Sequence, residues 1–473
     1  MANKYKIYCA GNFITTKDEF QISNSFDNSI IGISYYASEN ELELSIYKAQ
    51  EAQPILKKMP SYIKTRILNE IATGLQTEKK ELANILASEA CKPLKYALAE
   101  VERSIQTFKI AAEEAGRIEG EYIHVDRTQA GEGKEALVKQ FPIGLVAGIA
   151  PFNFPLNLAV HKIAPAIAAG CPMILKPASS TPLSNLFLTK IIDKTELPKG
   201  AISILPMNRK VGNLLVTDER FKLLTFTGSP EVGWEMKKHC GKKKIVLELG
   251  GNAAAIVTQS ANIDLAIKKC LIGAFAYSGQ VCIHTQRIYV NKNIFDEFIS
   301  KFIAETKTLK SGNPLDISTD ISSMIDENNA IRVENWISEA ITDGAKLLYG
   351  GKRNGTFVEP TILTKTTKAM KVNSEEVFGP VVVIEPYNFF TEAIEMVNDT
   401  KFGLQAGVFT NLISEMNEAF SEIDCGGVII NDSPTFRVDQ TPYGGVKDSG
   451  IGREGVKYAI VDMCEPKILV KNK

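Results

Sequence analysis

The chain has 473 residues, of which 44% are hydrophobic and 23% charged, and its formal net charge is −1 at pH 7. This length predicts two or three domains, and the near-zero charge argues against nucleic acid or an anionic membrane as a partner. The sequence shows no secretion signal at its start and no apolar run long enough to span a bilayer, so we expect a cytoplasmic protein.

Helices dominate the chain up to about residue 120. Apolar residues at three-to-four spacing predict helices over 41–58, 63–75, 79–89 and 95–115. Pro54 should kink the first helix or end it early, because proline cannot donate a backbone hydrogen bond. The following segment, 122–138, is polar and irregular with a Gly-Glu-Gly turn at 131–133, which suggests a projecting hairpin.

From residue 142 short buried strands alternate with helices. The expected strands are 144–150, 173–175, 202–205, 223–226 and 245–249, and the helices between them are 156–169, 183–193, 211–217 and 231–239. This alternation predicts a doubly wound parallel sheet, which binds ligands at the carboxyl ends of its strands. A second α/β series follows, with helices 263–276 and 295–309 and strands 287–290, 381–384 and 427–430. The β-like tail 467–470, together with the hairpin, suggests pairing between subunits.

A carboxylate and a thiol lie at the ends of predicted buried elements. Glu248 closes an apolar strand, and Cys282 follows the small and polar residues 278–281. The two form a minimal pair for covalent catalysis with hydrolysis, in which the thiol attacks and the carboxylate activates water. A salt-bridged glutamate and a core cysteine are the plainer interpretations.

Two strand-to-helix turns offer further polar groups. Asn153 lies between two prolines, where its amide could stabilise an oxyanion or simply cap the next helix. Lys176 follows a strand and could reach ribose hydroxyls or phosphate, although a surface lysine is also possible.

Two more turns suit parts of a nucleotide. Gly228 and Ser229 open a helix and fit a pyrophosphate, although a simple N-cap explains Ser229 equally well. Glu376 could accept hydrogen bonds from sugar hydroxyls, with Phe378 packing against a flat ring, or could belong to a solvated acidic turn.

A catalytic metal is not expected. The eight cysteines form no C-x-x-C pair, and the four histidines show no spacing typical of metal ligands. Because the chain is long and shows no secretion signal, we expect reduced thiols.

In this order, the segments around Asn153, Lys176, Gly228, Glu248, Cys282 and Glu376 resemble the aldehyde dehydrogenase superfamily. The resemblance spans nearly the whole chain and includes Pro442-Tyr443-Gly444-Gly445-Val446-Lys447. It implies three parts: a dinucleotide-binding domain (1–121 and 142–249), an α/β catalytic domain (250–442) and a small β oligomerisation element (122–141 and 443–473). It also implies a homodimer or homotetramer.

The resemblance also implies roles for individual residues. Cys282 would attack an aldehyde, Asn153 with the N–H of Cys282 would stabilise the oxyanion, and Glu248 would activate water to release the acid. The residues implied to bind NAD(P) are Pro151, Phe152, Lys176, Ser179, Gly228, Ser229, Leu249, Gly250, Glu376 and Phe378.

Cofactor choice depends on the third residue after the lysine. Many NAD-preferring members have glutamate there, whereas this chain has Ser179. Without that carboxylate a 2′-phosphate meets no like charge, so we predict that NADP is accepted, alongside NAD.

The substrate prediction depends on two arginines. Residues 431–439 resemble those of members acting on lactaldehyde and on phosphonate- or phosphate-bearing aldehydes. Arg103 and Arg437 at the expected substrate entrance, with Phe154 as a third candidate, favour a small hydroxylated or anionic aldehyde such as lactaldehyde, glycolaldehyde or a semialdehyde. The alternative is that both arginines form internal ion pairs.

Three other functions remain open. In a CoA-acylating aldehyde dehydrogenase CoA takes the acyl group, but the presence of Glu248 favours hydrolysis. A non-catalytic binding or structural protein on the same fold would not need Asn153, Glu248 and Cys282. A thiol hydrolase without a cofactor would leave Lys176, Ser229 and Glu376 unexplained.

Overall fold

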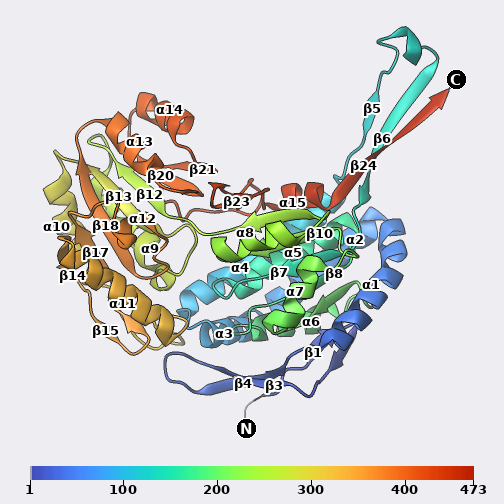
Figure 1. Cartoon of the computed structure of the whole chain (residues 1–473), viewed down its shortest axis with the longest axis horizontal. Coiled ribbons are helices and arrows are strands. Elements are labelled where there is room, and N and C mark those ends of the chain that lie inside the picture. The colour runs from blue at the N-terminus through green and yellow to red at the C-terminus, as the bar shows by residue number, and fades with distance from the viewer. Residues whose placement is uncertain (1–2, 473) are drawn as a thin grey trace.

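The computed structural model describes residues 3–472 and contains two α/β lobes that face each other, with a narrow sheet projecting from the first (Figure 1). The predicted α/β class with parallel sheets is confirmed. Among the described residues, no helix combines the length and the apolar character that crossing a membrane requires.

The first lobe is built on an eight-stranded sheet with the order β2-β1-β9-β8-β7-β10-β11-β23. Its strands are β1 (Ile7–Cys9), β2 (Asn12–Ile14), β7 (Val146–Ile149), β8 (Met173–Lys176), β9 (Ile202–Ile204), β10 (Leu223–Thr227), β11 (Lys244–Glu248) and β23 (Gly450–Ile451). The five strands from β9 to β11 in this order run parallel, so their carboxyl ends share one edge.

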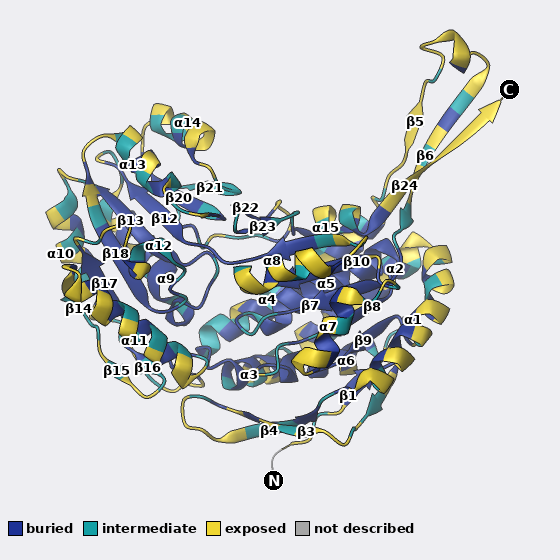
Figure 2. Cartoon of the chain, in the orientation of Figure 1, coloured by how far each residue is buried: buried dark blue, intermediate teal, exposed yellow. Residues whose placement is uncertain are grey.

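Two apolar cores cover this sheet. One contains residues from α2 (Ser61–Thr77), α3 (Lys79–Glu89), α4 (Leu94–Ala115), α5 (Pro155–Ala169), α6 (Leu183–Ile192) and α15 (Val456–Asp462). The other contains residues from α1 (Glu39–Lys58), α7 (Arg209–Thr217) and α8 (Pro230–His239). The sheet is therefore doubly wound, and its strands are buried in Figure 2.

Helix α1 does not end early at Pro54 but continues to Lys58. Only one turn follows the proline, so the missing N–H costs one hydrogen bond near the helix end. Leu56, in that last turn, is buried in the first core and holds the turn against the lobe. Packing thus outweighs the local preference of proline.

The second lobe contains a seven-stranded sheet with the order β14-β17-β18-β13-β12-β20-β21, parallel except for β14. Its strands are β12 (Ala253–Val257), β13 (Thr285–Asn291), β14 (Lys346–Tyr349), β17 (Thr361–Thr364), β18 (Val381–Tyr387), β20 (Gln405–Phe409) and β21 (Gly427–Ile430). Its helices are α9 (Ile263–Phe275), α10 (Phe295–Thr306), α11 (Glu327–Thr342), α12 (Lys371–Ser374), α13 (Phe390–Asn398) and α14 (Ile413–Glu422).

Short elements complete the fold. They are the pairs β3 (Glu19–Ser23) with β4 (Ile30–Tyr35), β15 (Arg353–Asn354) with β16 (Phe357–Val358), and β19 (Phe402–Gly403) with β22 (Val446–Lys447), and the 3-10 turns η1 (Gln129–Gly131) and η2 (Ala276–Gly279). The strands before α1 are an addition to the mostly helical N-terminal part that the sequence predicts.

The projecting sheet has the order β24-β6-β5, formed by β24 (Cys464–Asn472), β6 (Lys134–Pro142) and β5 (Glu121–Ile123). All nine residues of β24 pair with β6 of the same chain, and most of the sheet is exposed (Figure 2). By contrast, β23 joins the edge of β11, and α15 packs against α5. Of the C-terminal segment, only the last strand lies in the projection.

Candidate active site

Four strand ends of the first lobe place predicted residues at one edge. The turn after β7 contains Asn153, β8 ends at Lys176, β10 is followed by Gly228, and β11 ends at Glu248. The amide of Gly228 donates to the carbonyl of Glu248 across neighbouring turns, at 3.0 Å. The parallel arrangement therefore brings together residues that lie up to 95 positions apart.

Cys282 follows a tight turn in which three consecutive residues are left-handed, with φ of 52° at Tyr277, 54° at Ser278 and 68° at Gly279. Buried hydrogen bonds hold the turn: the Tyr277 hydroxyl donates to the Ala90 carbonyl at 2.9 Å, and Ser278 Oγ donates to a carbonyl at 2.7 Å. A Cβ at position 279 would lie 2.1 Å from a backbone oxygen, so glycine is required there. Strain of this kind persists only where the surroundings fix it.

The thiol of Cys282 is half-buried, with Sγ 3.1 Å from the hydroxyl of Tyr443. Burial raises the pKa of the Cys282 thiol to about 11, although the Tyr443 hydroxyl and the Arg437 charge partly oppose this. The resting group is therefore a thiol, and reaction requires removal of its proton.

Asn153 is buried beside this turn. Its Nδ2 donates to the carbonyl of Gln280 at 3.2 Å, two residues before Cys282. The backbone of Gly251 also approaches the Cys282 carbonyl, since a Cβ at 251 would lie 2.2 Å from that oxygen. The amide of Asn153 and the end of the Glu248 strand are thus both held against the cysteine turn.

Two buried glutamates that lie near each other, Glu248 and Glu454, differ sharply in their partners. Within the described chain, neither carboxylate oxygen of Glu248 has a hydrogen-bond partner, and burial together with the charge of Glu454 raises the pKa of Glu248 well above its ordinary value. Burial acts on Glu454 too, but the cations of Lys162 at 3.1 Å and Arg437 at 3.0 Å hold the pKa of Glu454 below its ordinary value. Such a divided pair is typical of acid–base sites.

Both predicted substrate arginines have internal ion partners, the alternative that the sequence left open. Asp439 Oδ1 lies 2.7 Å from an Arg103 nitrogen, 2.8 Å from His161 Nε2 and 3.9 Å from Arg437 Nε. The Nε of each arginine has no hydrogen-bond partner within residues 3–472. Arg103 keeps 30% of its side chain exposed, whereas Arg437 keeps 6%.

The remaining candidate, Phe154, is half-buried against the cysteine turn. Its ring meets that of Tyr277 edge to face at 6.1 Å, and Lys92 Nζ lies 3.8 Å from its centroid. Lys92 is ion-paired with Glu100, which accepts backbone hydrogen bonds at the start of α5. Phe154 is therefore held firmly in place.

The nucleotide side of the first lobe contains polar groups with few partners. Lys176 Nζ makes only a marginal 3.5 Å contact with the next carbonyl, and burial lowers the pKa of Lys176. Its aliphatic stem packs on Gly212, where a Cβ would lie 3.0 Å away. Ser229 sits at the N-cap of α8, but its side chain makes no capping hydrogen bond, unlike the simple N-cap that the sequence left open. Ser179 is half-buried in the turn after β8.

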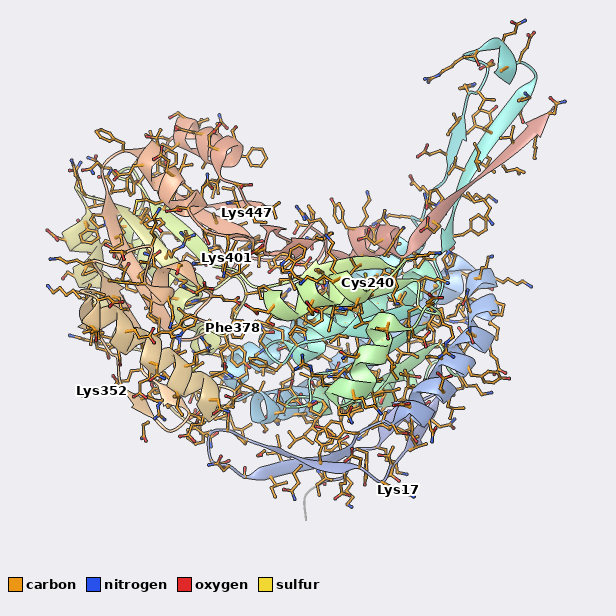
Figure 3. The ribbon with its side chains drawn as sticks, in the orientation of Figure 1. Lys17, Cys240, Lys352, Phe378, Lys401 and Lys447 are labelled. Atoms are coloured by element: carbon orange, nitrogen blue, oxygen red, sulfur yellow. The ribbon has the colours of Figure 1, made fainter. Side chains whose placement is uncertain are left out.

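The second lobe contributes Glu376 to the predicted nucleotide site. Glu376 Oε1 accepts from the amide of Gly251 at 2.9 Å, and a Cβ at Gly250 would meet Oε2 at 2.4 Å. Burial raises the pKa of Glu376 to about 8. Phe378 lies where the lobes meet (Figure 3), and its ring meets that of Phe152 edge to face at 5.7 Å.

The remaining residues predicted to bind the cofactor include Pro151 and Leu249. Pro151 is half-buried in the turn after β7, and Leu249 is buried against Gly233 of α8. A partly buried ammonium, a free helix-terminal hydroxyl and an under-paired carboxylate on opposing lobes fit a ligand rich in phosphate and hydroxyl groups. Within the described residues, no cluster of three or more histidine, cysteine or acidic side chains could hold a metal ion.

The sequence did not predict the contact of Tyr443 with Cys282, or the pairing of Asp439 and Glu454 with the arginines. These residues lie in or near the segment Pro442–Lys447, whose resemblance to the family marked it as important. Most of their partners are distant in sequence, so the contacts themselves could not be predicted.

Residues 13–469 match the model of the aldehyde dehydrogenase family. The chain belongs to this family. The aldehyde dehydrogenase is 41% identical over 470 residues to the 3-sulfolactaldehyde dehydrogenase of Priestia aryabhattai, covering 99% of this chain and 98% of the relative. It is also 41% identical to the lactaldehyde dehydrogenase of Methanococcus aeolicus, over 98% of this chain and all of the relative.

Among solved structures, this aldehyde dehydrogenase is similar to aldehyde dehydrogenase 21 from Physcomitrella patens in complex with the reaction product succinate. The TM-score is 0.98 at 45% identity, over 100% of this chain and 99% of the other. Similar structures hold NADP or NAD. The prediction of an NAD(P)-dependent enzyme that oxidises small aldehydes is thereby confirmed.

Proposed function

We propose that this aldehyde dehydrogenase oxidises small anionic or hydroxylated aldehydes to carboxylic acids by covalent catalysis at Cys282, with water as the acyl acceptor. The observation that carries the proposal is the half-buried thiol next to an under-paired, buried Glu248. A carboxylate whose pKa is raised is a stronger base than an exposed glutamate, which suits it to deprotonating water.

In the proposed reaction, the Cys282 thiol passes its proton to the ionised Glu248 carboxylate, which releases it to solvent, and the sulfur attacks the aldehyde carbon. The Asn153 amide and the N–H of Cys282 stabilise the resulting oxyanion, a type of contact worth on the order of 10²–10³ in rate. NAD(P)+, when bound, supplies the hydride acceptor, so that the carbon is left as a thioester. Glu248 then takes a proton from water, and the resulting hydroxide bonds to the thioester carbon. The C–S bond breaks, the acid leaves, and the proton held by Glu248 passes to the sulfur to restore the thiol.

The residues proposed to hold the dinucleotide line the facing edges of the two lobes. Lys176 and Glu376 suit the two riboses, and Gly228 and Ser229 suit the pyrophosphate. Ser179 places no carboxylate near Lys176, which supports use of NADP alongside NAD.

The proposed substrate class follows from the charge around Arg103. Arg103, Arg437 and Lys162 are ion-paired with two carboxylates, Asp439 and Glu454. The partly exposed Arg103 is the member best placed to meet a ligand. The relatives acting on sulfolactaldehyde or binding succinate have anionic ligands, which supports this class, and the lactaldehyde relative supports a hydroxylated alternative.

A substrate panel tests this proposal. We expect succinic semialdehyde or 3-sulfolactaldehyde to exceed lactaldehyde and glycolaldehyde in kcat/KM, and hexanal to be the poorest substrate. Arg103→Met should lower kcat/KM for the anionic aldehydes by about 10–100-fold, the value of a hydrogen bond to a charged group, and for lactaldehyde much less.

Arg117→Met removes an exposed arginine at the end of α4 and serves as the matched control, with all substrates unaffected. A clear preference for hexanal, or an equal loss on every substrate in Arg103→Met, would contradict the anionic class. Activity remaining in Cys282→Ala would contradict the covalent route itself.

The projecting sheet supports assembly into a homodimer or homotetramer. Ile468, Leu469 and Val470 of its edge strand β24 are each at least half exposed, which is unusual for apolar residues on an open sheet edge. Light scattering of the purified enzyme measures the assembly. A cytoplasmic location remains a prediction from the sequence.

A further inference from the structure

Tyr443 contacts the nucleophile and one of the two arginines predicted from the sequence to bind the substrate. Its hydroxyl lies 3.1 Å from Cys282 Sγ, and the Arg437 guanidinium lies 3.6 Å from the centre of its ring. The side chain is buried in a small cluster with Tyr277, Val281 and Ile283 from the cysteine turn. Tyr443 is therefore held between the nucleophile and the buried Arg437.

We propose that Tyr443 is a catalytic residue whose hydroxyl donates a hydrogen bond to the Cys282 sulfur when that sulfur becomes anionic. In the resting pair either atom can donate. Once the thiol has lost its proton, only the tyrosine hydroxyl can do so. This inference rests on the proposed role of Cys282 as the nucleophile.

The surroundings keep Tyr443 protonated for this purpose. Burial, followed by the neighbouring Cys282, raises the pKa of Tyr443 well above its ordinary value, so the hydroxyl keeps its proton while the thiol loses its own. The Arg437 charge over the ring partly opposes this rise in the pKa of Tyr443, which favours donation by the hydroxyl.

Four charged or titratable groups face the Cys282 sulfur. Tyr443 and Arg437 favour the thiolate, whereas Glu376 and Glu248 oppose it when ionised. Of these, Tyr443 is the one with a hydrogen bond to the sulfur, and hydrogen bonds to ionised groups are roughly twice as strong as neutral ones. Its contribution can therefore be separated from the longer-range charges.

The test uses iodoacetamide on the full-length enzyme, with no aldehyde and no dinucleotide present. Cys282 and Cys425 are the two half-buried thiols, and the other six are buried. Burial raises the pKa of Cys425 to about 11, like that of Cys282, but its Sγ donates to the Gly427 carbonyl. Mass spectrometry of both peptides gives the two alkylation rates in one sample, with Cys425 as an internal reference.

In Tyr443→Phe we expect a thiolate fraction at Cys282 about tenfold smaller at neutral pH. Because a more basic thiolate is a better nucleophile, the alkylation rate should fall only about threefold, with Cys425 unchanged. Tyr387→Phe is the matched control, since it removes a buried hydroxyl that donates to the Val257 carbonyl in a separate apolar cluster of the second lobe, and it should leave the Cys282 rate unchanged.

If Tyr443→Phe does not fold, replacement of Tyr443 by 3-fluorotyrosine keeps the shape and makes the hydroxyl a stronger donor. We then expect faster alkylation of Cys282 at neutral pH. An equal or faster rate in folded Tyr443→Phe, or no acceleration with fluorotyrosine, would overturn the inference. These outcomes do not depend on turnover, whereas the covalent route fails separately if Cys282→Ala remains active.

Discussion

The ion-paired cluster around Asp439 and the under-paired edge formed by Lys176, Glu376 and Glu248 both consist of polar groups that are at least half-buried, but the partners of these groups differ. Asp439 has three cationic or imidazole neighbours within 4 Å. Lys176 makes one marginal contact, and Glu248 has no hydrogen bond within the described residues.

The difference indicates which polar groups are paired by the protein itself and which need a ligand as their partner. Burying a polar group without a partner costs free energy, so such groups persist where binding or chemistry uses them. Paired charges instead fix the positions of the loops that they join. Three predictions test this distinction, from the largest effect to the smallest.

The strongest test compares the two neighbouring glutamates. Glu248→Gln should give one equivalent of NAD(P)H per active site and then stall, with steady-state turnover reduced by about 10³-fold or more, because no base remains to activate water. Rapid-mixing absorbance at 340 nm measures the burst. Its Tm should stay near that of the unmodified enzyme, since no hydrogen bond is lost.

Glu454→Gln is the counterpart. It removes the charge that pairs with Lys162 and Arg437, so we expect it to lower the free energy of unfolding by about 3 kcal/mol or more. Full turnover in Glu248→Gln, or an unchanged Tm in Glu454→Gln, would contradict the view that under-paired groups serve catalysis and ion-paired groups stabilise the fold.

The second test concerns cofactor choice beside Lys176. Ser179→Glu places a carboxylate where a 2′-phosphate would bind, so kcat/KM with NADP should fall by about 10–100-fold while that with NAD changes little. Ser180→Glu adds the same charge at the exposed neighbouring residue and serves as the control. Equal losses with both cofactors in Ser179→Glu would show that this turn does not discriminate between them.

The smallest effect is on stability. The folded-state pKa of Glu376 is raised to about 8, above its unfolded value, so the ionised carboxylate destabilises the fold increasingly as the pH rises from about 4.5 to about 8. Glu376→Gln should therefore raise Tm by about 1–2 °C at pH 9 and have little effect at pH 5. Calorimetry at both pH values measures this, and a lower Tm at pH 9 would mean that the carboxylate is already satisfied.

The sequence predicted much of this site because of one geometric rule. Residues that follow consecutive parallel strands must meet at one edge, which places Asn153, Lys176 and Glu248 together without knowledge of packing. The small and polar residues before Cys282 were also visible in the sequence, but the tight turn that they form was not predicted.

Contacts made across the chain could not be predicted in this way. Tyr443 reaches Cys282 because β23 pairs antiparallel with β11, a register that no local pattern specifies. The helix through Pro54 depends on burial of Leu56, and β1 is held by neighbours about 200 residues away. In each case tertiary packing decided the outcome.

The late position of the segment 443–454 affects how the enzyme is made. During synthesis, Cys282 and Glu248 leave the ribosome long before Tyr443, the strand that closes the edge of β11, and the β24 partner of β6. A nascent chain can therefore have both lobes while its active site is still unfinished and two strand edges are open. Chains cut short by only some thirty residues should be inactive and prone to aggregate.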